Sequence, residues 1–100
     1  MEQADRPSIW TLGIIGRGDK LAELKEAVER GADIHELQDD HYSLLHCAAE
    51  NGSMVNVRFL LERGADASRK SRGKTPAESA RDQGEAEIAE LIETFAQNSD

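Results

Sequence analysis

Three histidines, one cysteine and two adjacent aspartates fall within thirteen positions of the chain, and all of these residue types can bind metals or take part in catalysis. They are His35, Asp39, Asp40, His41, His46 and Cys47. Their spacing matches no zinc-ligand pattern. A Cys-His nucleophile pair must converge, whereas adjacent helical residues such as His46 and Cys47 point about 100° apart. With no convergent set of acid, base and nucleophile, we expect no enzymatic activity, no metal and no cofactor.

Two short motifs overlap in the segment from Gly16 to Asp19. Gly16-Arg17-Gly18 resembles part of a phosphate-binding loop but lacks the third glycine and the Lys-Ser/Thr pair. Arg17-Gly18-Asp19 is an integrin-binding tripeptide, but no secretory signal precedes it, and Asp19 suits the N-terminal turn of a helix. We therefore interpret both motifs as structural.

Length and charge restrict the class of protein. One hundred residues correspond to a single domain. Twelve basic and twenty acidic residues give a net charge of −8, which argues against nucleic acid and anionic membranes as partners. No apolar run approaches the roughly 20 residues of a membrane span, and the single cysteine cannot form an internal disulfide. We expect a protein of the cytoplasm, with the nucleus as the alternative.

The basic residues are not spread evenly. Arg69, Lys70, Arg72 and Lys74 stand together without an acidic residue among them. This segment, residues 69–74, is a basic cluster on an otherwise acidic chain.

The chain contains an internal repeat. The pentapeptide Glu-Arg-Gly-Ala-Asp at 29–33 recurs at 62–66, an offset of 33 residues. At an offset of 32, Ser43 matches Thr75 and Gly52 matches Gly84. Repeats of this period are typical of solenoid proteins, in which each unit packs only against its neighbours.

Each unit has the signals of two helices. Ser43 and Thr75 suit helix N-caps, and Pro76 suits a first helical position. These residues predict short helices over 44–50 and 76–83, ended by glycine. A second, longer helix follows in each unit, with apolar residues at helical spacing. Its apolar positions are Met54, Val57, Leu60 and Leu61 in one unit, and Ile88, Leu91, Ile92 and Phe95 in the next.

These units resemble the ankyrin repeat, whose signature T-P-L-H-x-A-A precedes a glycine and whose repeat closes with G-A-D. Residues 43–52 read Ser-Leu-Leu-His-Cys-Ala-Ala-Glu-Asn-Gly, and residues 64–66 read Gly-Ala-Asp. The resemblance implies an all-α solenoid of stacked helix-turn-helix units with short β-turn fingers. It also implies that the His46 ring is structural and hydrogen-bonds backbone between neighbouring repeats.

The resemblance divides the chain into three repeats between two disordered tails, 1–7 and 97–100. Residues 8–33 form an N-terminal capping repeat, 34–66 a central repeat and 67–96 a C-terminal capping repeat, in which Arg81 and Glu93 replace apolar residues. We expect Trp10 to pack within the N-terminal cap, the alternative being an exposed partner anchor. The stretch from Gly64 to Thr75 is one residue shorter than that from Gly31 to Ser43. We therefore expect an irregular second finger.

In this family the finger tips and the short helices form the binding surface. The resemblance therefore implies partner-binding residues on the concave face, namely Asp39, Asp40, Tyr42, Glu50, Asn51, Arg72, Lys74 and Asp82. Tyr42 is either the anchor for a partner or a shield for its own finger. The implied function is a non-catalytic protein-interaction module, monomeric by itself, that acts as an adaptor, inhibitor or effector. The alternative is binding of phosphate, on a phosphoprotein or nucleic acid, through the basic cluster 69–74.

Overall fold

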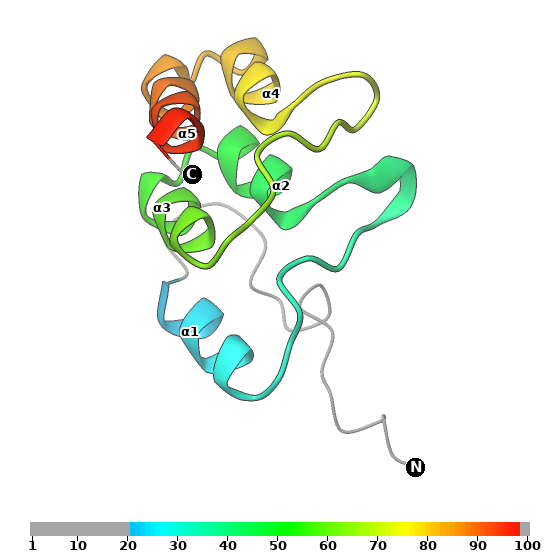
Figure 1. Cartoon of the computed structure of the whole chain (residues 1–100), viewed down its shortest axis with the longest axis vertical. Helices are drawn as coiled ribbons and strands as arrows, with labels where there is room; N and C mark the ends of the chain where they lie inside the picture. The colour runs from blue at the N-terminus through cyan, green and yellow to red at the C-terminus, as the bar shows by residue number, and fades with distance from the viewer. Residues whose placement is uncertain (1–20, 99–100) are drawn as a thin grey trace.

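The helices of the protein stack in pairs, as a computed structural model that describes residues 21–98 shows (Figure 1). This part of the chain contains no β-sheet, so the all-α prediction is confirmed. None of its helices is long and apolar enough to cross a membrane. Trp10 and the motifs between Gly16 and Asp19 lie outside the described residues. The helices are α1 (Leu21–Glu29), α2 (Leu44–Glu50), α3 (Met54–Glu62), α4 (Pro76–Asp82) and α5 (Ala86–Asn98), with a short 3-10 turn η2 (Asp39–His41).

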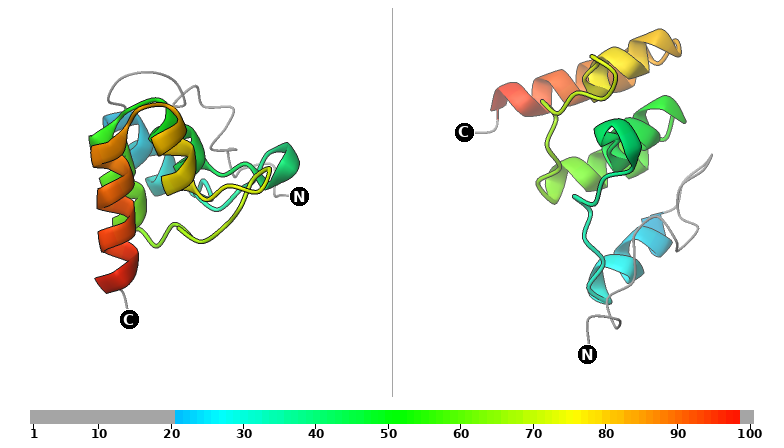
Figure 2. Two further views of the ribbon diagram at one scale, coloured as in Figure 1. Left: turned by 90° about the horizontal axis from the view of Figure 1, so that it is seen from above. Right: turned by 90° about the vertical axis from the view of Figure 1, so that its right-hand side faces the viewer.

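The helices form two layers. The short helices α2 and α4 pack side by side in the inner layer, and α3 lies between α1 and α5 in the outer layer (Figure 2). The connections η2 and 71–74 project from the inner layer, away from the outer helices (Figures 1 and 2). The connection at η2 is the first finger, which belongs to the central repeat. The connection at 71–74 is the second finger, which belongs to the C-terminal repeat.

The predicted caps fix where the inner helices begin. The Ser43 hydroxyl accepts the backbone N–H of His46 at 3.1 Å, and the Thr75 hydroxyl accepts that of Glu78 at 3.2 Å. In return, the Glu78 carboxylate accepts the Thr75 N–H at 2.9 Å, which completes a capping box. Pro76 occupies the first turn of α4. The predicted starts of both inner helices are therefore confirmed.

Gly52 turns the chain from α2 into α3. Its φ of +77° lies in the left-handed region, which favours glycine. A Cβ at this position would lie 2.7 Å from a carboxylate oxygen of Glu85, so that flexible side chain would also have to move. The positive φ is the main reason that glycine suits this turn.

The predicted apolar faces form one core that runs through all described repeats. The side chains of Val57, Leu60 and Ile92 are at most 1 % exposed. Leu24 of α1 and Leu45 of α2 are 2 % and 1 % exposed. Because this core is continuous between helix pairs, each pair depends on its neighbours for stability.

An ion pair joins the two helices of the C-terminal repeat. Arg81 on α4 and Glu93 on α5 form a two-pronged ion pair, in which Nη2 donates to Oε1 at 3.0 Å and Nη1 contacts Oε2. The hydrogen bond from Arg81 holds the pKa of Glu93 below its usual value. This polar pairing supports the interpretation of the repeat as a cap. Helix α5 continues to Asn98, so the predicted boundary at residue 96 falls inside it.

Candidate binding site between the fingers and the inner helices

Each finger is a tight turn closed by a pair of backbone hydrogen bonds. In the first finger, Gln38 and Tyr42 exchange bonds of 2.9 and 3.3 Å around a three-residue loop. In the second finger, Ser71 and Lys74 exchange bonds of 2.9 and 3.1 Å around only two residues. The expectation of an irregular second finger was wrong, because the additional residue lies in the first.

The finger tips adopt left-handed backbone conformations. Arg72 and Gly73 have φ values of 55° and 81°, which match the two-residue hairpin turn with positive φ at both positions. Asp40 and His41 have φ values of 63° and 60°. Both fingers extend outward from the helices (Figure 2).

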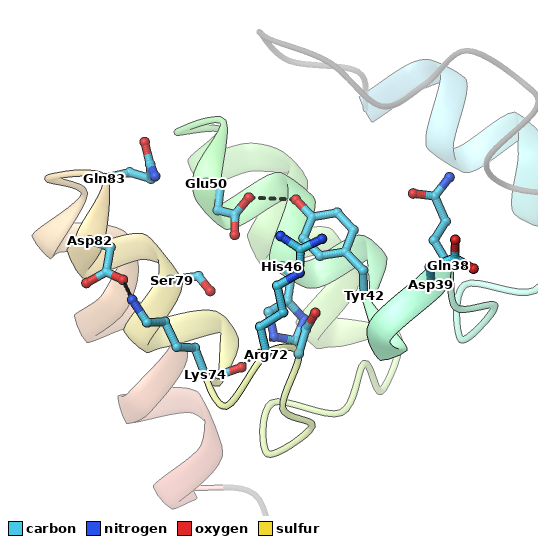
Figure 3. A pocket seen from close by; sticks show the side chains of 11 residues that line it. Gln38, Asp39, Tyr42, His46, Glu50, Arg72, Lys74, Ser79, Asp82 and Gln83 are labelled. Carbon is cyan, nitrogen blue, oxygen red and sulfur yellow. Dashed lines mark hydrogen bonds and ion pairs between the residues drawn. The ribbon is translucent and has the colours of Figure 1, made fainter.

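A cavity of about 890 Å³ lies between the fingers and the inner helices (Figure 3). Both fingers and both helices contribute to its wall, and every lining residue carries a polar or charged group. The lining residues are Gln38, Asp39, Tyr42, His46, Glu50, Ser71, Arg72, Lys74, Ser79, Asp82 and Gln83.

The cavity brings together most of the residues that the resemblance implies for binding. Asp39, Tyr42, Glu50, Arg72, Lys74 and Asp82 line it. Two of the predicted residues do not. Asp40 instead accepts a hydrogen bond from Nε of Arg72 at 3.0 Å, and the Asn51 amide donates to the Cys47 sulfur at 3.4 Å.

Five lining residues were not in the predicted set: Gln38, His46, Ser71, Ser79 and Gln83. Ser79 could have been found from spacing, since it lies three residues before Asp82 and so shares its side of α4, and Gln83 follows Asp82 directly at the end of that helix. Ser71 lies on the second finger beside the predicted Arg72, whereas Gln38 required knowledge of which residues pair across the first finger. His46 is predicted to be structural and is therefore not among the predicted binding residues.

Each finger is tied to the end of its own inner helix by a contact that spans eight residues. The Tyr42 hydroxyl donates to Oε1 of Glu50 at 2.6 Å. At the equivalent positions of the next repeat, Nζ of Lys74 forms an ion pair with Oδ2 of Asp82. The same connection is therefore made by a neutral donor in one repeat and by a cation in the next.

Tyr42 is a half-buried side chain, and its ring centroid lies 5.7 Å from that of His46. Burial, followed by the hydrogen bond to Glu50, raises the pKa of its hydroxyl. The ring therefore covers the base of its own finger, and it also forms part of the cavity wall. Both roles expected for Tyr42 are compatible with this position.

His46 joins the two repeats through its ring. The ring is completely buried, and Nε2 lies 2.9 Å from the backbone oxygen of Lys74. Because Nδ1 accepts the backbone N–H of Ser43 at 3.4 Å, Nε2 carries the proton and donates to Lys74. The prediction that His46 bonds backbone between repeats is confirmed.

Cys47 is not in the setting of a nucleophile. Burial raises the pKa of the Cys47 thiol, whereas a nucleophilic cysteine needs a lowered pKa. Within residues 21–98, no three His, Cys, Asp or Glu side chains gather as they would around a metal ion.

Half of the basic cluster 69–74 is occupied by carboxylates of the same chain. Arg72 pairs with Asp40 of the first finger, and Lys74 pairs with Asp82 of α4. The cluster that is uniformly basic in sequence is thus partly neutralised in space.

Comparison with known families agrees with the repeat architecture. A family model of ankyrin repeats matches residues 15–99 as three copies. The chain belongs to the ankyrin-repeat family, whose members are generally protein-interaction modules and typically not enzymes. A search of curated protein sequences found no significant match.

Proposed function

We propose that this protein is a non-catalytic interaction module that binds another protein in the cavity between its fingers and inner helices. The observation that carries the proposal is the cavity itself, which is lined by polar side chains from two successive repeats. Its volume is within the range of about 300–1,000 Å³ that ligand sites usually have, so it accommodates several side chains of a partner. An adaptor, inhibitor or effector acting as a monomer in the cytoplasm or nucleus would use such a site.

The cavity is held in shape before a partner arrives. The His46 ring bonds the backbone of the second finger, and Arg72 bonds Asp40 of the first. Tyr42 bonds the end of α2. A preformed site loses less conformational entropy on binding, which favours affinity.

Tyr42 supplies the cavity's aromatic contact surface. An aromatic side chain with a polar tip offers a large contact area at low entropic cost, and such residues are enriched among those that dominate binding energy. The hydrogen bond to Glu50 fixes the ring before binding. Tyr42 therefore serves both its own finger and the partner.

Site-specific photo-crosslinking tests this proposal. A photoreactive amino acid replaces Gln83, which is exposed and lines the cavity, and in a matched variant it replaces Glu90, which is exposed on α5. In cells that produce the protein, we expect a protease-sensitive, nuclease-resistant adduct with the first variant only. Equal adducts from both positions, or adducts from Glu90 alone, would contradict the proposed site.

The same experiment separates protein binding from the phosphate alternative. Binding of nucleic acid through the basic cluster 69–74 would give adducts that nuclease removes. We favour a protein partner because Arg72 and Lys74 already have carboxylate partners, which an added phosphate would have to displace.

A further inference from the structure

The charged residues of the cavity are not balanced. Both basic residues that line the cavity are paired with carboxylates. Lys74 pairs with Asp82, which also lines the cavity, and Arg72 pairs with Asp40. No basic side chain within residues 21–98 forms an ion pair with Glu50. Its hydrogen-bond partner is the neutral Tyr42 hydroxyl, which orients the carboxylate without cancelling its charge.

Glu50 is also placed where a positive charge is favoured. It is the last residue of α2, and Asp82 is the last residue of α4, so both carboxylates stand at the C-terminal ends of helices. Helix C-termini carry partial negative charge, which adds to that of the side chains. Glu50 is partly buried, so its charge is less screened by solvent than that of a surface carboxylate.

A second, independent feature marks this cavity as a ligand site. Ser79 is 6 % exposed, and Ser71 is 7 % exposed. Both line the cavity, and Figure 3 shows the Ser79 side chain between the two inner helices. Neither hydroxyl forms a hydrogen bond with another residue of the described chain. A buried hydroxyl without a partner costs free energy, so an incoming polar group gains by bonding it.

These two features call for the same chemistry. A lysine ammonium has three N–H donors, and an arginine guanidinium has five. Such a group can pair with the Glu50 carboxylate and still donate to the oxygen of Ser79. A phosphate or a carboxylate would be repelled by Glu50 instead.

We propose that the partner inserts a lysine or arginine side chain into the cavity, where Glu50 binds its charge and the Ser79 hydroxyl accepts one of its remaining N–H groups. The inference rests on the proposed function, because it names the chemistry of the partner at that same site. Tyr42 is a positioning residue here, since it acts through Glu50.

A random peptide library displayed against the whole chain tests the charge requirement. Wild-type protein should enrich peptides with lysine or arginine at one shared position. Glu50→Gln keeps the shape of the side chain and should lose that preference, whereas the matched control Glu90→Gln, on the exposed face of α5, should retain it. Circular dichroism verifies that both variants are folded.

An enriched peptide then allows a double-mutant cycle by fluorescence polarisation. We expect Glu50→Gln to weaken binding by about tenfold or more, as for the loss of a hydrogen bond to a charged group. A peptide with norleucine in place of its basic residue should bind wild type and Glu50→Gln equally. Ser79→Ala should weaken the binding of the basic peptide by about threefold to tenfold, as expected for the loss of one hydrogen bond. Exchange of lysine and arginine in the peptide decides which of the two is preferred.

The outcomes distinguish the two proposals. Enriched peptides that bind in the cavity without a shared basic residue, or acidic peptides that depend on Arg72, overturn this inference and leave the proposed function intact. The inference is also overturned if Glu50→Gln weakens the binding of the basic peptide and of the norleucine peptide by the same factor. A library that yields no binder at all contradicts both.

Discussion

The central and C-terminal repeats carry different residue pairs at equivalent positions, and the two pairs differ in charge. Tyr42 and Glu50 of the central repeat correspond to Lys74 and Asp82 of the C-terminal repeat, and each pair ties a finger to its helix. The cation of the second pair neutralises its carboxylate, whereas the phenol of the first does not. The carboxylate of the C-terminal repeat is therefore ion-paired within its own repeat, whereas that of the central repeat keeps a negative charge that no cation of the described residues neutralises.

The third position of each inner helix shows a similar contrast. His46 and Glu78 both complete a capping box with the residue three positions before them. The His46 ring is buried because the next repeat covers it, and its second nitrogen bonds that repeat. Glu78 is exposed, and in the described chain no further repeat follows it. The third helical position is therefore a buried residue that joins two repeats in α2 and an exposed capping residue in α4.

The outer contacts differ in the same way. Ala49 and Leu61 are buried in the central repeat, and the corresponding residues one repeat later are Arg81 and Glu93. Two buried apolar side chains in the central repeat therefore correspond to an ion pair between exposed side chains in the C-terminal repeat. Within the described residues, the central repeat thus has apolar side chains where the C-terminal repeat has charged ones, as expected for a capping repeat.

The largest effect is expected from the core of the central repeat. Leu60→Ala removes a completely buried side chain from α3, which packs against both α1 and α5, and should lower the free energy of unfolding by about 2 to 5 kcal/mol. The equivalent change in the terminal repeat, Ile92→Ala, should cost less because α5 has a repeat on one side only within the described residues. Urea unfolding measures both. Equal losses would show that the terminal repeat is as strongly coupled as the central one.

The next effect compares the two capping boxes. His46→Ala removes the hydrogen bond to the Lys74 carbonyl, which keeps only its bond from the Ser71 N–H, and opens a buried space; the loss should cost about 2 to 4 kcal/mol. Glu78→Ala removes one exposed capping bond and should cost about 0.5 to 1 kcal/mol. Thermal and urea unfolding of the two variants side by side would show the difference. If both variants lost the same stability, the bond between repeats would have no special role.

The smallest effect concerns pH. The pKa of Glu93 is held below its ordinary value by Arg81, so the carboxylate contributes stability that is fully present above that ordinary value and is lost as pH falls through the lowered one. Glu93→Gln should therefore melt slightly below wild type at neutral pH, and the two proteins should converge in acid. Because both side chains are largely exposed, added salt should also reduce the difference. A difference that persists in acid would assign the effect to packing instead of charge.

Much of this fold follows from local signals. Ser43 and Thr75 satisfy amides within one helical turn, and Gly52 and Gly84 end the inner helices through their own backbone freedom. Interactions of this kind involve residues a few positions apart, so residue type and spacing are enough to predict them. The family resemblance predicted that the finger tips and the short helices share one binding surface. It thereby identified most of the residues that line the cavity.

The contacts that give the cavity its charge could not be predicted in this way. Arg72 and Lys74 belong to one basic cluster in sequence, yet one pairs with a carboxylate 32 residues earlier and the other with one eight residues later. The sequence by itself determined the repeat length, the helix ends and the apolar faces, because these depend on short-range hydrogen bonds and periodicity. Only the tertiary structure decided which charges are paired and which hydroxyls are left without a partner, because both depend on distances between repeats that stacking alone sets.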